Sequence, residues 1–296
     1  MKNARVAFAV FFFVLAVPAV VGAAGATENR VHIDGGTVEG EVSFELTSDE
    51  PLNYWDVGVE LPDGARVEAV EDSQGTVGDY AVEDGNLEFR TNTGVARRSE
   101  TVTVEYVVGD ATVETYADGS LRVVEVGLVG FGTGTADVGT TARITAEETV
   151  FSASPDASFS LEATGDEAVY TGNGATTVRV AVGEAGTGYE NYAVFGEANL
   201  TEADEVYDVV PAAFGFEPPA YKHPVVVVTD RRYDEVAEGW SEGQYRPGGV
   251  ILLRGSASDD VGTVLHETAH AYNSKALAWT DETVGWFEEG TSRYIE

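Results

Sequence analysis

Cysteine is absent from this chain of 296 residues, and lysine occurs only at Lys2, Lys222 and Lys275. Without cysteine the chain can form no disulfide, use no thiolate nucleophile and offer no thiolate ligand to a metal. Any metal site must therefore be built from histidine, carboxylate and other nitrogen or oxygen donors.

Positive charge of either kind is scarce, with 17 basic residues against 51 acidic ones and a formal net charge of −34. We expect no nucleic acid as a partner, because a phosphate-binding face needs a basic patch and none is visible in the sequence. In ~1 M salt the Debye length falls to about 3 Å, which screens the self-repulsion of such a chain. The composition resembles that of proteins from halophilic archaea, and an ordinary acidic extracellular protein is the alternative.

Residues 1–26 are typical of a secretory signal peptide. Lys2 and Arg5 precede an apolar run over 6–21, and small residues follow it. Pro18 argues against a long spanning helix. We expect a secreted or cell-surface protein, with the membrane as a partner only if this segment is retained as an anchor.

Residues 27–187 predict an all-β domain. Apolar and polar residues alternate over 38–46, 101–107 and 177–181, the period of half-buried strands, and Gly, Asp and Asn turns separate the runs. Such short strands favour a β-sandwich or a long saddle-like sheet.

From residue 188 to 296 the pattern changes to that of a mixed α and β region. The spacing of apolar residues predicts one helix over 200–214, and the continuous apolar run 224–229 predicts a strand covered on both faces. A further helix begins after Ser256 or Ser258, which we expect to cap it.

That helix carries the motif His266-Glu267-Thr268-Ala269-His270. Residues four apart share one helix face, so both imidazoles can reach a single ion. Hydrolytic zinc needs three protein ligands and an open position for water, and Glu289, separated from His270 by 18 residues, supplies the third. Glu267 then points towards the water and acts as general base. The alternative is an ordinary helix with two surface histidines.

The two motifs together resemble the gluzincin zinc metallopeptidases, nearest the alanyl-aminopeptidase and leukotriene-hydrolase type. The match also includes the residues around the third ligand, namely Trp286, Gly290, Tyr294 and Glu296. The resemblance implies a thermolysin-like α/β domain over 188–296, one Zn²⁺ per chain and a peptide or protein substrate. It further implies an N-terminal β domain that walls the cleft, for which a spacer or adhesive module is the alternative.

In gluzincins the strand before the zinc helix lies at a sheet edge and binds the substrate backbone. By this resemblance we expect that role for Val250, Ile251, Leu252 and Leu253. Arg293 lies four residues after Glu289 on a predicted helix, where it holds the carboxylate in place or forms a solvated salt bridge.

The chain departs from the family at two places. The glutamate that binds the substrate's free amino terminus has no counterpart in 244–249, so exo and endo cleavage both stay open. The family's oxyanion-binding tyrosine comes well after the third ligand, whereas this sequence ends at Glu296, so we expect a truncated chain.

The sequence as a whole predicts an exported zinc peptidase. The alternative from another class is a non-catalytic surface protein with a binding β domain and a structural or vestigial zinc site. Zinc hydrolysis of a non-peptide amide is a third possibility.

Overall fold

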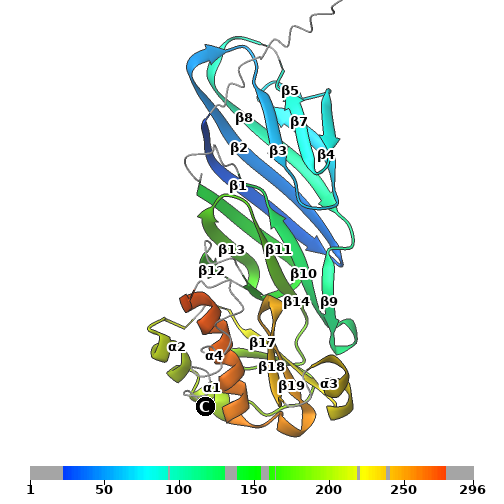
Figure 1. Ribbon diagram of the computed structural model, residues 1–296, viewed down its shortest axis with the longest axis vertical. Helices are drawn as coiled ribbons and strands as arrows, with labels where there is room; N and C mark the ends of the chain where they lie inside the picture. Colours follow the sequence, from blue (N-terminus) through cyan, green and yellow to red (C-terminus); the bar gives the residue numbers. More distant parts are fainter. Residues whose placement is uncertain are drawn as a thin grey trace, which may run out of the picture.

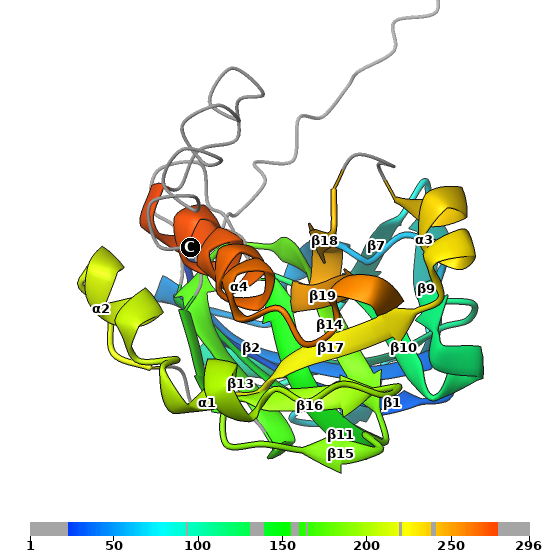
Figure 2. The same ribbon diagram turned by 90° about the horizontal axis from the view of Figure 1, so that it is seen from below.

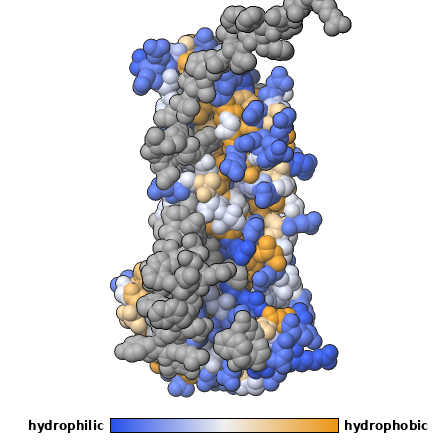
Figure 3. Space-filling view, viewed as in Figure 1, coloured by the Kyte–Doolittle hydropathy of each residue, from blue (hydrophilic) through white to orange (hydrophobic). Residues whose placement is uncertain are grey.

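The computed structural model describes residues 23–92, 94–130, 139–154, 160–163, 165–218, 221–237 and 241–277. The molecule is elongated, with an upper part made of strands and a lower part made of a smaller sheet and helices (Figure 1). In the view of Figure 3, hydrophilic side chains project around the outline, with hydrophobic residues between them over the upper strands.

Two sheets form the upper part. The larger has the strand order β5-β4-β8-β2-β1-β11-β14-β10-β9, with β13 beside β11 and β12 beside β13, and the smaller has the order β3-β7-β6. Their strands are β1 (Ala23–Asp34), β2 (Thr37–Leu52), β3 (Asp56–Glu60), β4 (Ala65–Asp72), β5 (Gly75–Thr76), β6 (Tyr80–Glu83), β7 (Asn86–Arg90), β8 (Arg97–Val108), β9 (Thr112–Tyr116), β10 (Leu121–Leu128), β11 (Gly139–Ser154), β12 (Ser160–Ala163), β13 (Gly165–Asn173) and β14 (Thr176–Gly183).

The alternating runs expected to be strands lie in β2, β8 and β14, so these predictions are confirmed. In β2 every second residue from Val38 to Leu46 is buried, and at Gly40 the ring of Tyr106 occupies the place of a side chain. Val42 and Phe44 of β2 share a core with residues of β3 and β7, so the smaller sheet packs on the larger one. The described structure as a whole is mostly sheet with few helices.

The predicted signal peptide lies almost wholly outside the described residues. β1 begins at Ala23, which pairs with Thr47 of β2, so a cut after residue 26 would remove the first four residues of this strand. Cleavage and the domain bounds stay predictions. Among the described residues, no helix is long and apolar enough to cross a membrane.

The lower part is a sheet with the order β15-β16-β17-β19-β18 and helices around it. β16, β17 and β19 are parallel, whereas β15 and β18 pair antiparallel at the two edges. The elements are β15 (Thr187–Gly188), β16 (Tyr192–Phe195), α1 (Thr201–Glu205), α2 (Val209–Phe214), β17 (His223–Val228), α3 (Asp230–Val236), β18 (Gly243–Arg246), β19 (Val250–Arg254) and α4 (Val261–Leu277).

Both faces of this sheet are covered, as the continuous apolar run 224–229 predicts. In β19, Ile251 and Leu253 face α1, α2 and α4, whereas Val250 and Leu252 face α3 and the upper sheet. β16 and β17 alternate in the same way. The lower sheet is therefore the middle layer, with α1, α2 and α4 on one face and α3 and the upper strands on the other.

The single helix expected over 200–214 is wrong, because two short helices, α1 and α2, take its place. Pro211 explains the break. In a continuous helix its ring would clash with the carbonyl of Tyr207 and it could donate no hydrogen bond there. In the structure Pro211 falls in the first turn of α2, where no donor is needed, and the Tyr207 carbonyl accepts from the Val210 N–H at 3.0 Å.

Candidate metal centre

Helix α4 carries the two histidines of the motif, and Figure 2 shows it lying over the sheet beside β18 and β19. Its N-terminus is capped by Asp260, whose Oδ2 accepts from the Thr263 N–H at 2.8 Å and from its hydroxyl at 2.6 Å. The predicted Ser256 and Ser258 caps are therefore wrong. Both serines belong to the preceding turn, in which the Ser256 N–H donates to Asp230.

The face of α4 opposite the solvent is apolar and packs on the sheet. Val264, Leu265, Ala269 and Tyr272 lie in the core with residues of β16, β17 and β19. These four residues form the apolar stripe of α4. Burial of this stripe fixes which side of the helix faces outward.

One buried hydrogen bond also holds the rotation of α4 about its axis. The Thr268 hydroxyl lies 2.8 Å from the carbonyl of Val264 and 3.0 Å from the Tyr192 hydroxyl. Because the threonine has one hydroxyl proton and donates it to that carbonyl, Tyr192 must donate to Thr268. Thr268 lies between the two histidines in the sequence, so the bond ties that turn of α4 to β16.

A second buried group supports the next turn of the helix. The Tyr207 hydroxyl is 2.6 Å from the Tyr272 hydroxyl and 2.9 Å from His223 Nε2. Phe214 stacks on the outer ring of this group, Tyr272, with centroids 6.0 Å apart. Burial raises the pKa of Tyr272 to about 12 and lowers that of His223 to about 4, so both groups are neutral near pH 7. His223 is a core residue and not a metal ligand.

His266 and His270 converge at the partly exposed side of α4. Their Nε2 atoms are 3.3 Å apart, and the two rings meet edge to face with centroids 5.0 Å apart. Two nitrogen ligands at about 2.0–2.1 Å from a tetrahedral zinc ion lie about 3.3–3.4 Å apart. The separation of the two Nε2 atoms therefore matches that of two ligand positions of one zinc ion.

Glu267 faces the edge strand β18, and the residue is 5% exposed. A Cβ added to Gly243 of β18 would lie 2.8 Å from Glu267 Cγ and 2.9 Å from Thr263 Cγ2. Only glycine lets α4 come this close to the strand. Burial raises the pKa of Tyr233, and the Glu267 carboxylate raises it further, which marks Tyr233 as a neighbour of this carboxylate.

The edge position expected for Val250 to Leu253 is wrong. These four residues lie in β19, which pairs with β17 on one side and with β18 on the other, and all four are fully buried. The edge strand is β18, formed by Gly243–Arg246. The chain turns back after β18, so the strand that comes directly before α4 lies inside the sheet.

Glu289 and Arg293 lie outside the described residues. Among the described residues, no group of three or more His, Asp or Glu side chains could hold a metal ion. The third ligand and its neighbour therefore stay predictions. Sequence reasoning missed Tyr192, Gly243 and Tyr233, because no local pattern reports which buried side chains meet a helix from another strand.

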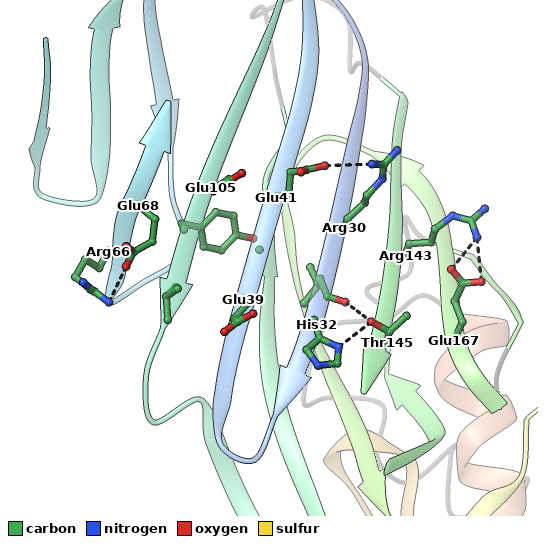
Figure 4. Close-up of a pocket in the computed structure, with 14 residues that line it drawn as sticks. Arg30, His32, Glu39, Glu41, Arg66, Glu68, Glu105, Arg143, Thr145 and Glu167 are labelled. Carbon is green, nitrogen blue, oxygen red and sulfur yellow. Dashed lines mark hydrogen bonds and ion pairs between the residues drawn. The ribbon is translucent and has the colours of Figure 1, made fainter. Parts of the chain in front are cut away.

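A separate hollow of about 830 Å³ lies on the outer face of the large upper sheet (Figure 4). His32 is half-buried there, with its Nδ1 3.1 Å from Thr145 Oγ1. Every arginine of the hollow is engaged by a glutamate, in the pairs Arg30–Glu41, Arg66–Glu68 and Arg143–Glu167. We interpret this hollow as an ion-paired, solvated sheet face.

No family model matches the chain, and no curated protein matches it. Among solved structures it is similar to an M1 zinc metallopeptidase from Deinococcus radiodurans, with 15% identity, a TM-score of 0.40 and coverage of 93% of this chain and 70% of that one. It is also similar to leukotriene A4 hydrolase from Saccharomyces cerevisiae, with 13% identity, a TM-score of 0.43 and coverage of 84% and 44%. The chain thus spans less than half of the yeast enzyme. With TM-scores below 0.5, these likenesses assign no activity to this chain.

The buried His223 predicts a pH dependence of stability. Its pKa is lowered from 6.5 to about 4 in the folded chain, so the unfolded chain takes up the proton first as pH falls. The contribution of neutral His223 is therefore complete above pH ~6.5 and is lost as pH falls towards ~4. The free energy of unfolding, measured with denaturant at constant high salt, should fall more steeply with decreasing pH for the wild type than for His223→Gln. Above pH ~7 the two curves of this free energy against pH should be parallel. If the two curves are also parallel below pH ~6, His223 is not the buried neutral group described here.

Proposed function

We propose that this chain is a zinc-dependent peptidase of the gluzincin kind. In this proposal His266, His270 and Glu289 hold one Zn²⁺, and Glu267 is the general base. The observation that carries the proposal is the 3.3 Å separation of the two Nε2 atoms, on a helix whose rotation is fixed by burial. When bound, zinc supplies a Lewis acid that polarises the substrate carbonyl and eases deprotonation of water.

In this proposal Glu267 accepts and then donates the proton that is transferred during hydrolysis. One carboxylate oxygen takes a proton from the attacking water as the new C–O bond forms at the carbonyl carbon. The same oxygen then gives the proton to the amide nitrogen as the C–N bond breaks. The position of Glu267 beside the edge strand β18 and directly after His266 supports this role, because it places the carboxylate next to the proposed metal and substrate positions.

The edge strand β18 is where the substrate backbone binds in this proposal. Within the described sheet β18 has a neighbour on one side only, and α4 lies next to it. An extended peptide can add to such an edge as a further strand, which brings a carbonyl alongside α4. This role replaces the one expected for β19.

We further infer an exported protein that works at high salt, from the signal-like residues 1–26 and the net charge of −34. Peptides or proteins are its partners in this proposal, and nucleic acid is not. The rival is a non-catalytic surface protein whose upper sheets bind a partner and whose zinc is structural.

Two substitutions test the metal centre. Glu267→Gln should retain one zinc per chain and lose peptide turnover by about 10²–10⁴-fold, because only the proton acceptor is removed. His270→Ala should lose the zinc itself. Zinc content and peptide cleavage are measured together in high salt, with Glu88→Gln on the exposed face of β7 as the control. Bound zinc without cleavage by the wild type would favour the rival.

Gly243→Ala tests the approach of the edge strand to Glu267. The new methyl group must displace Glu267 or Thr263, and a misplaced base lowers turnover by about 10- to 100-fold. Zinc content should not change, because the atoms nearest to the methyl group belong to Glu267 and Thr263 and not to a histidine. Gly58→Ala in β3, where a Cβ meets no atom within 4 Å, is the matched control. Unchanged turnover in Gly243→Ala would show that β18 does not set the position of Glu267.

Free and N-acetylated peptides should be cleaved at comparable rates. The β18 residues that face α4 are Gly243, which has no side chain, and Tyr245, and the strand contains no Asp or Glu that could bind a substrate amino group. Rates for one peptide sequence with and without the acetyl group decide the point. Cleavage of the free peptide alone would establish an aminopeptidase whose amine-binding carboxylate lies elsewhere.

A further inference from the structure

The turn between β18 and β19 is the place where the lower sheet meets the upper one. This turn, η2 (Pro247–Gly249), contacts β10, β11 and β14. Gly248 has φ of +81°, and a Cβ at this position would lie 2.7 Å from Val123 Cγ1 of β10. Two features therefore disfavour any side chain at position 248: the positive φ and the contact with the Val123 methyl group.

The two faces of β10 pack on different parts of the molecule. Leu121 and Val123 lie in a core with β16, β17 and β19, whereas Val124 and Val126 lie in the core of the upper sheet. The shared core is continuous across the junction. It comprises Leu121, Val123, Phe151 and Ala181 from the upper part, and Ala193, Phe195, Val226, Tyr233, Val250 and Leu252 from the lower part.

Aromatic packing confirms that the junction is a core and not a loose contact. Phe151 of β11 and Phe195 of β16 meet edge to face, with ring centroids 5.3 Å apart and an interplanar angle of 89°. Both rings are buried. Such pairs contribute about 0.5–1.5 kcal/mol beyond their buried area. The upper part is therefore a fixed support for the lower sheet.

The strand β18 connects this junction to the metal centre. At one end it continues into the η2 turn against Val123, and at the other Gly243 packs against Glu267. Between these ends, each residue of β18 pairs with β19, which is buried on both faces. A shift of the turn must therefore move the strand that borders the general base.

We propose that Val123 is a positioning residue for the edge strand, acting through Gly248 and β18 on the substrate edge and on Glu267. The effect of Val123 on turnover rests on the proposed function. The mechanical link, by which the packing of Val123 on Gly248 holds β18 in place, does not. The upper β part is then a component of the site and not a detachable spacer.

Hydrogen exchange of the β18 amides tests the link directly. Val123→Ala should speed exchange in the segment 241–249 by about tenfold relative to the wild type, because the turn loses its support. Val126→Ala is the matched control, since it removes the same methyl groups from the same strand at an equally buried position on the other face. Equal acceleration in the two variants, or none in Val123→Ala, would overturn the proposal.

A second pair of variants keeps the test decisive. Gly248→Ala should speed exchange in the same segment, through the clash with Val123 and the positive φ. In the Val123→Ala background the clash is absent, so the further effect of Gly248→Ala should be several-fold smaller. An effect of the same size in both backgrounds would show that the contact does not act on the turn.

Peptide turnover of the same variants is measured separately from hydrogen exchange. Val123→Ala should lower kcat for a peptide with zinc content unchanged, whereas Val126→Ala should retain the wild-type kcat. If the wild type cleaves no peptide, the proposed function fails and the exchange data still decide the mechanical link. If the wild type cleaves peptides and Val123→Ala has the wild-type kcat, the positioning role is overturned.

Discussion

The rotation of α4 about its own axis is the constraint on which the candidate site depends. Its apolar stripe is buried against the five-stranded sheet, and each fully buried Val or Leu side chain contributes about 1.5–3 kcal/mol. The hydrogen bond from Tyr192 to Thr268 fixes the same rotation at the turn between the histidines. With that face held, His266 and His270 can only face outward together.

The same sheet that holds α4 is itself held by the upper strands. Its second face shares a core with β10, β11 and β14, so the lower part has no exposed apolar back face in its described residues. This arrangement explains why β16, β17 and β19 are almost wholly apolar, with His223 and Arg254 at strand ends as the exceptions. The two parts of the chain form a single packed unit around the edge strand that borders Glu267.

Much of this could be predicted from local patterns. The four-residue spacing of the histidines and the apolar stripe of α4 have the period of a helix, and the strands β2, β8 and β14 have the period of two. The remaining features depend on pairing between distant residues. The edge strand is β18 and not β19 because the chain reverses at Gly248, and the order of strands in a sheet leaves no local signal. The sequence offers Ser256, Ser258 and Asp260 as possible caps of α4. The structure uses Asp260, because both serines belong to the preceding turn.

Anomalous diffraction at the zinc edge, from crystals of the protein grown with zinc at high salt, tests the metal centre most directly. The expected result is a single peak about 2.0–2.1 Å from Nε2 of both His266 and His270, with a carboxylate as a third ligand and one position not filled by protein. A peak at another place, no peak between the two histidines, or four protein ligands would contradict a hydrolytic metal centre on α4.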